Sequence, residues 1–160
     1  GVQVNLHLST IIPEDYLPDI HERLVLYKRI ASAGTREEIQ HLREEMVDRF
    51  GKMPDSTHHL LEIAQFKLRA RALGVDRLEA GPVGGRVVFS HRPKVGPEQL
   101  VQLLQSDPQT YGLHGDRELR IKADWANAET RIQGVRALLD QLEQAPAGAA
   151  AATETADQSK

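Results

Sequence analysis

The segment from residue 27 to residue 54 constrains the fold of this chain most, because it encodes two helices joined by a tight turn. Thr35 and Glu38 form a capping box, in which the hydroxyl accepts from the amide of Glu38 and the carboxylate returns to the amide of Thr35. Gly34 follows the first helix and Gly51 follows the second, each where a left-handed residue ends a helix without strain. These signals place both helices and the turn between them.

The N-terminal half of the chain reads as three helices. The first begins at a second capping box, Asp19 with Glu22, and runs to about Ala33. The apolar faces of the first two helices, as the helical period predicts them, are Ile20, Leu24, Tyr27 and Ala31 for the first and Ile39, Leu42, Met46 and Phe50 for the second, which spans about 36–50. A third helix runs from Asp55 to Leu73 and stops at Gly74. Three helices with short turns are expected to pack as a small bundle.

Strand patterns flank this helical part. Residues 2–8 alternate apolar and polar side chains, and residues 77–80 and 86–90 surround a glycine-rich turn, as in a hairpin. A short helix from Pro97, a strand over 118–122 and a last helix over about 126–143 complete the pattern. The predicted fold class is α+β: an N-terminal strand and a three-helix segment, followed by a small, mostly antiparallel sheet with two further helices. We expect the N-terminal strand to join the hairpin, because an isolated pair of strands is marginally stable.

Composition limits the class of protein. The 160 residues carry a net charge of −3 and contain no cysteine, which argues against broad capture of nucleic acid and favours a reducing cytoplasm. No secretory signal or membrane-spanning run is recognisable, and the start at Gly1 suggests a piece of a longer protein. Residues 1–144 are predicted to form a single domain. Residues 145–160 lack branched or aromatic apolar anchors and are predicted to be a disordered tail.

The sequence contains no complete motif for catalysis, a cofactor or a metal. Gly51 and Lys52 are followed by Met53, so the phosphate-binding loop is incomplete, and the position four after His21 is not a second histidine. His58 and His59 are adjacent and point about 100° apart on a helix, which disfavours one shared metal. We therefore predict no catalytic, cofactor-binding or metal-binding residue in this domain, which we interpret as non-enzymatic.

Two charged groups allow a second interpretation. The acidic flank of the second helix, opposite its apolar face, carries His41, Glu45 and Asp48, and a solvated helix face is its plainest interpretation. The basic residues Lys28, Arg29, Lys67, Arg69, Arg71, Arg77 and Arg86 are candidates for a nucleic-acid patch. Aromatic residues for base stacking make up only 4% of the chain, so a solubilising role is the simpler interpretation.

The order of residues in three segments indicates a protein family. Tyr-Lys-Arg-Ile-Ala-Ser-Ala at 27–33, Glu-Met-Val-Asp-Arg-Phe-Gly at 45–51 and Pro54 closely resemble the C-terminal domain of bacterial transcription-repair coupling factors, the TRCF domain. Similar features continue at 73–75, 104–109 and 130–132, so the resemblance covers about residues 2–143. The C-terminal tail does not match.

The resemblance implies a function without catalysis. Proteins of this family are ATP-driven DNA translocases, dependent on ATP and Mg, that displace stalled RNA polymerase and recruit excision repair. The resemblance implies that this domain docks on a UvrB-like module of the same polypeptide, masks the recruitment of UvrA and restrains the motor. Glu45 and Asp48 match acidic positions of the family motif, so with Arg49 and His41 they are the predicted interdomain contact. The alternatives are a positive docking platform for UvrA or RNA polymerase, and an accessory nucleic-acid-binding module, although we expect the motor rather than this domain to bind DNA.

Overall fold

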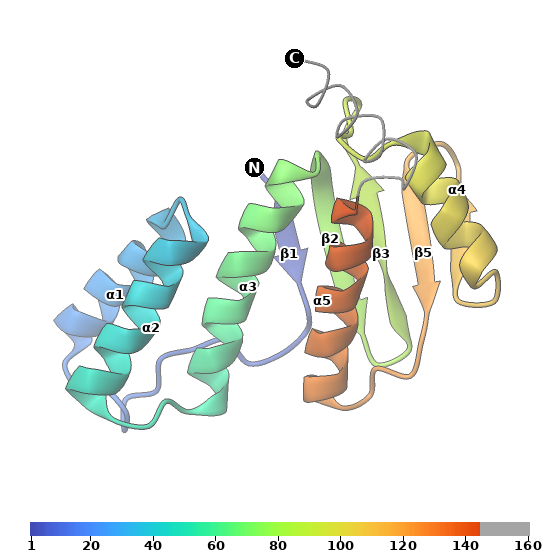
Figure 1. The fold of residues 1–160 in the computed structure, drawn as a ribbon. Coiled ribbons are helices and arrows are strands. Elements are labelled where there is room, and N and C mark those ends of the chain that lie inside the picture. The colour runs from blue at the N-terminus through green and yellow to red at the C-terminus, as the bar shows by residue number, and fades with distance from the viewer. Residues whose placement is uncertain (145–160) are drawn as a thin grey trace, which may run out of the picture.

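The computed structural model describes residues 1–144, which form five helices and five strands (Figure 1). The helices are α1 (Ile20–Ser32), α2 (Arg36–Phe50), α3 (Asp55–Ala72), α4 (Pro97–Ser106) and α5 (Ala128–Glu143). The strands are β1 (Gln3–Asn5), β2 (Val75–Gly81), β3 (Gly84–Phe89), β4 (Tyr111–His114) and β5 (Glu118–Lys122). The predicted α+β class is confirmed. The predicted tail lies outside the described residues, and the division of the chain at residue 144 stays a prediction.

The strands form one mixed sheet in the order β1-β2-β3-β5-β4. β1 lies parallel to β2, with Val4 opposite Leu78, while the other neighbours are antiparallel. The N-terminal strand therefore joins the hairpin, as predicted. The sequence does not predict strand β4, because its four residues, with one glycine and only one partly buried side chain, show no clear alternation.

Helices α3, α4 and α5 cover one face of the sheet, and α1 and α2 pack beside α3 (Figure 1). Two hydrophobic clusters follow from this layout. One lies between the sheet and its covering helices, with Phe66 of α3 and Val87 of β3 fully buried, and the other lies between α1, α2 and α3 around Met46 and Leu61. Since α3 contributes to both clusters, it is the element that joins the helical part to the sheet.

The caps of α1 and α2 correct two details of the prediction. Thr35 accepts from the amide of Glu38 at 3.1 Å, as expected, but the Glu38 carboxylate accepts from the amide of Gly34 instead of Thr35, at 2.7 Å. The residue that ends α1 is Ala33, in an extended conformation, so Gly34 is not the predicted left-handed terminator. Ala33 and Thr35 are both extended, so the turn between the two helices is made without a left-handed residue. Gly51 and Gly74, with φ of +88° and +71°, do end their helices in the left-handed region.

The predicted inward face of α1 is wrong except at Tyr27, which is half-buried against the helical cluster. Leu26 and Ile30 are the buried residues of this helix, whereas Ile20 and Leu24 are 65% and 61% exposed. The apolar residues of α1 cover more than one side of the helix, so periodicity alone could not decide which side meets α3. On α2, by contrast, the predicted Ile39, Leu42 and Met46 are buried and Phe50 is half-buried.

Candidate functional site

The rotation of α2 determines which of its side chains reach the surface. Its core face of Ile39, Leu42 and Met46 packs toward α1 and α3. At about 100° per residue, His41, Glu45 and Asp48 fall within an arc of about 60° on another side of the helix. The structure therefore brings these three predicted residues onto one flank, which is called the α2 flank below.

Glu45 is held by arginines of its own domain. Its two carboxylate oxygens accept from both terminal nitrogens of Arg29 on α1, at 2.7 and 3.0 Å. Arg49, one turn along α2, donates to the same carboxylate at 3.1 Å and to Glu22 of α1 at 2.9 Å. A chain of ion pairs thus ties α1 to α2, and its bidentate geometry is the stronger kind of arginine–carboxylate contact.

These contacts change the acidity of Glu45. Hydrogen bonds from Arg29, followed by those from Arg49, lower the pKa of Glu45 from 4.5 to about 2. The carboxylate therefore stays ionised across the physiological range, although Arg29 and Arg49 already occupy its oxygens. A partner arginine would have to compete with Arg29 for Glu45.

Asp48 and His41 are placed differently from Glu45. Both are exposed, and neither forms an ion pair or side-chain hydrogen bond with another residue in the part of the chain that the structure describes. His41 borders a shallow hollow between α1 and α2 that Arg29 and Glu38 also line. Of the predicted residues, Asp48 is therefore the carboxylate that the fold leaves available to a partner.

Arg49 is anchored on both sides. Besides its two carboxylate partners, its guanidinium lies 4.7 Å from the centre of the Phe50 ring, and Phe50 meets Tyr16 edge to face with ring centres 5.9 Å apart. The Tyr16 hydroxyl lies 3.1 Å from the carbonyl oxygens of Met46 and Gly51. Arg49 therefore braces the end of α2, and whether it also contacts another domain stays a prediction.

Arg29 and Glu22 also belong to this flank, which the sequence pattern does not predict. From its sequence position Arg29 is a basic-patch candidate with Lys28, within the family-like segment 27–33. Only the packing of α1 against α2 shows that Arg29 faces Glu45, sixteen residues away in the sequence.

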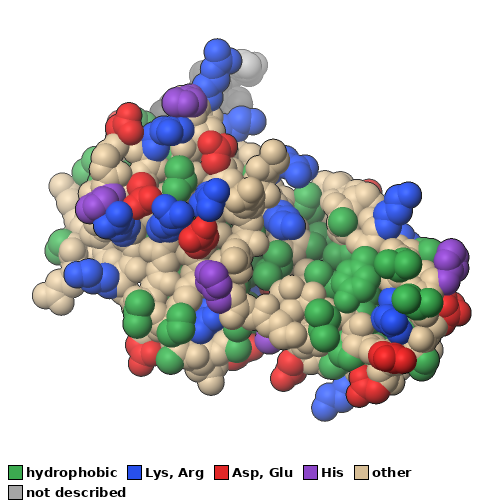
Figure 2. Space-filling model, turned by 180° about the vertical axis from the view of Figure 1, so that it is seen from behind, with side chains coloured by type: hydrophobic (Ala, Val, Ile, Leu, Met, Phe, Trp, Pro, Cys, Tyr) green, Lys and Arg blue, Asp and Glu red, His purple; other side chains and the backbone are tan. Residues whose placement is uncertain are grey.

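Four of the seven basic residues considered for nucleic-acid binding form ion pairs within the fold, whereas Lys28, Lys67 and Arg71 form none among the described residues. Arg69 is buried and paired with Asp140 and Glu143, and Arg29 is paired with Glu45. Arg77 and Arg86 belong to a ladder of ion pairs with glutamates on the uncovered face of the sheet, where Figure 2 shows basic and acidic side chains interleaved. Pairing of this kind reduces the positive field available to a phosphate backbone.

Over residues 1–144 the structure shows no cluster of three or more His, Cys, Asp or Glu side chains arranged to hold a metal ion. His58 instead accepts a hydrogen bond from Arg43, and His59 contacts the carbonyl oxygen of Ser9. In the same part of the chain, no helix combines the length and apolar character needed to cross a membrane.

Comparisons with known proteins agree on one family. The family model described as the TRCF domain matches residues 6–100. The transcription-repair-coupling factor of Escherichia coli (strain K12) is 39% identical over 142 residues, and that of Haemophilus influenzae (strain ATCC 51907 / DSM 11121 / KW20 / Rd) is 37% identical over 136 residues. These alignments cover 89% and 85% of this chain, but the chain spans only 12% of the length of either relative.

A solved structure shares the fold. The crystal structure of the C-terminal domain of a transcription-repair coupling factor superposes with a TM-score of 0.76, covering 88% of this chain and 91% of the other. Its sequence is 23% identical, so this likeness supports the architecture alone.

Proposed function

The chain belongs to the TRCF domain family, and on that premise we propose that it is a non-catalytic regulatory domain of an ATP-dependent DNA translocase in transcription-coupled repair. In this proposal the domain docks on a UvrB-like module of the same polypeptide, covers the surface that recruits UvrA and restrains the motor. ATP and Mg belong to the motor, as does the DNA that it moves along. RNA polymerase acts on the domain indirectly, by favouring the undocked state.

The observation that carries the docking proposal is that Asp48 is exposed and unpaired among the described residues. This exposed carboxylate stands without an ion-pair partner in the described part of the chain, one turn from Glu45, which arginines of the same domain hold. Asp48 also lies within the segment that resembles the family motif. A fixed helix end with one uncommitted carboxylate suits recognition by an arginine of a partner surface.

Charge at such a contact also suits release. A polar interdomain surface forms and dissociates more readily than a large apolar one, and its exposed charges are screened by salt. A ligand that favours the undocked state then acts through its differential affinity for the two states. We infer that docking weakens as the salt concentration rises.

The experiment compares Asp48→Lys with Asp116→Lys, a matched reversal of an exposed aspartate in the turn before β5. Each variant of this chain is titrated against the UvrB-like module of its own parent at two salt concentrations, and each is also placed in the full-length parent. Asp48→Lys is expected to weaken docking by about tenfold and to raise basal ATPase activity and UvrA binding. Asp116→Lys is expected to leave all three unchanged.

Glu45 is unsuitable for this test, because its reversal would also break the Arg29 pair and loosen α1 from α2. Unchanged docking in Asp48→Lys, with the domain folded, would remove the α2 flank from the proposal. If Asp48→Lys instead lowered UvrA binding by the parent, the domain would be a positive platform rather than a cover.

A further inference from the structure

Helix α1 carries an apolar stripe of which only Tyr27 packs against the core. Ile20 and Leu24 are 65% and 61% exposed, and at about 100° per residue they share one side of the helix with Tyr27 and Ala31. Figure 2 shows hydrophobic side chains gathered at the end of the molecule that holds the three N-terminal helices. Contiguous apolar surface of this kind, rimmed by charge, marks interaction sites on soluble proteins.

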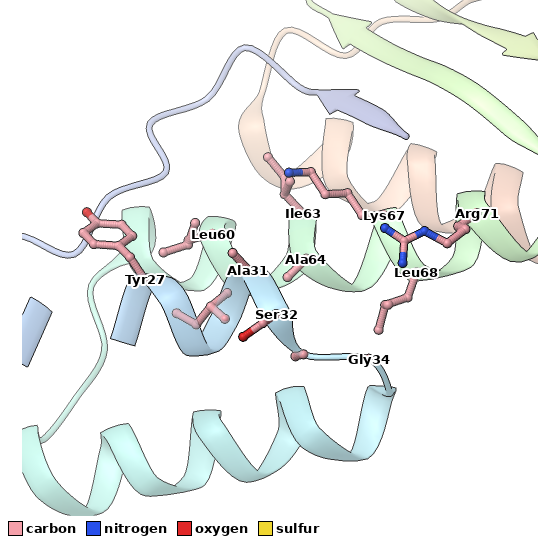
Figure 3. A pocket seen from close by; sticks show the side chains of 12 residues that line it. Tyr27, Ala31, Ser32, Gly34, Leu60, Ile63, Ala64, Lys67, Leu68 and Arg71 are labelled. Carbon is pink, nitrogen blue, oxygen red and sulfur yellow. The ribbon is translucent and has the colours of Figure 1, made fainter. Parts of the chain in front are cut away.

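The stripe leads into a groove of about 490 Å³ between α1 and α3 (Figure 3). The wall formed by α3 consists of Leu60, Ile63, Ala64, Lys67, Leu68 and Arg71. Their spacing describes one complete side of a helix over three turns. The opposite wall is the second half of α1 and the turn after it, where Ala31 and Gly34 are small enough to let a partner approach closely.

The charge around this groove has one sign. Two cations line it, Lys67 and Arg71, and no carboxylate does. In the described part of the chain neither cation forms an ion pair, whereas the neighbouring Arg69 is buried against Asp140 and Glu143. Lys67 and Arg71 are one helical turn apart on α3, so two carboxylates one turn apart on a second helix would match them.

We propose that this groove binds an amphipathic helix of a partner protein, which inserts apolar side chains between α1 and α3 and aligns carboxylates on Lys67 and Arg71. The apolar walls provide the burial, and the two cations select the charge of the partner and its direction along the groove. This surface is separate from the α2 flank, because Arg29, which holds Glu45, leaves α1 about 200° around the helix from Tyr27. The domain thus has two docking surfaces, one acidic and one apolar with a basic edge.

The test is a selection with the whole 160-residue chain as the target. The probe is a display library of helical peptides about four turns long, randomised on one side and at the flanking positions. Enriched peptides are expected to combine apolar residues at helical spacing with at least one Asp or Glu on a flank. The most enriched peptide is then synthesised and titrated against variants of the chain.

Two variants on α3 examine the shape and the charge of the groove separately. Ala64→Arg fills the groove, and the double variant Lys67→Glu with Arg71→Glu reverses its charge; each is expected to weaken the peptide by at least about tenfold. The matched control reverses two exposed cations in the loop after β3, Arg92→Glu with Lys94→Glu. It is expected to bind the peptide as tightly as the unsubstituted chain does. Far-ultraviolet circular dichroism checks that each variant is folded.

Four results would overturn the proposal. The first is a selection without enrichment, and the second is an enriched peptide that is insensitive to the charge reversal. The third is peptide binding that appears only after truncation at residue 144, which would make residues 145–160 the occupant of the groove. The fourth is a concentration-dependent dimer of the unsubstituted chain that Ala64→Arg abolishes, which would make a second copy of the chain the occupant of the groove.

Discussion

Replacing Glu45 by glutamine separates the internal role of this residue from any role in docking. The substitution keeps the shape of the side chain and removes the charge that Arg29 and Arg49 contact. A fall of the Glu45 pKa from 4.5 to about 2 corresponds to an upper limit of about 3.4 kcal/mol, at about 1.36 kcal/mol for each pH unit. The side chain is 34% exposed, and measured surface pairs contribute about 0.2–1 kcal/mol each, so solvent screening reduces the expected loss to about 1–2 kcal/mol.

The pH dependence of this loss has a defined sign. Because folding lowers the pKa of Glu45, its contribution is complete above about pH 4.5 and is lost as the pH falls through about 2. Urea unfolding of the parent and of Glu45→Gln at pH 7 is expected to show midpoints about 0.5–1 M apart. At pH 3 the two midpoints are expected to lie closer together.

Glu44→Gln is the matched control, because Glu44 is exposed on the same helix and its one side-chain hydrogen bond within residues 1–144 is with the neutral amide of Gln40. Its unfolding free energy is expected to stay within about 0.5 kcal/mol of the parent. Equal stability of Glu45→Gln and the parent at pH 7 would refute the internal role. A gap that is the same at pH 7 and pH 3 would show that the loss does not come from the charge.

Three further changes address the packing. Gly134→Ala would push a methyl group into the Trp125 indole. Urea unfolding is expected to show a free energy of unfolding lower by about 1–3 kcal/mol, despite the higher helix propensity of alanine, and the fluorescence emission of this single tryptophan is expected to shift. Arg131 is buried and donates to carbonyl oxygens just after β1 and just before α5. Arg131→Gln is expected to lower the free energy of unfolding by about 3 kcal/mol. A loss under about 1 kcal/mol would show that these hydrogen bonds do not stabilise the fold. Gly84→Ala places a side chain at φ +128° against the backbone of β5 and is expected to prevent folding as judged by circular dichroism, whereas Gly112→Ala, which meets no atom within 4 Å, is expected to fold.

Much of the secondary structure was predictable because its signals are local. Thr35 and Asp19 cap their helices through hydrogen bonds to residues two or three positions away, and Gly51 ends α2 through its own conformation. The hairpin of β2 and β3 likewise depends on the few residues of its turn. Such elements can be assigned from neighbouring residues alone, and the structure confirms them.

The candidate site was only partly predictable. Periodicity placed His41, Glu45 and Asp48 on one flank, since an α-helix of known core face leaves little freedom. It did not show that Arg29 occupies the Glu45 carboxylate, which leaves Asp48 as the uncommitted group. That difference decides which substitution tests docking and which one tests stability.

The sequence by itself determined the five helices, four of the five strands, the inward face of α2 and the family. Tertiary structure alone decided which side of α1 is covered, that β4 extends the sheet, and that Arg131 reaches a carbonyl oxygen 125 residues away. The physical reason is range: caps and periodicity come from contacts within one or two turns, whereas burial and ion pairing depend on the segments that folding brings alongside.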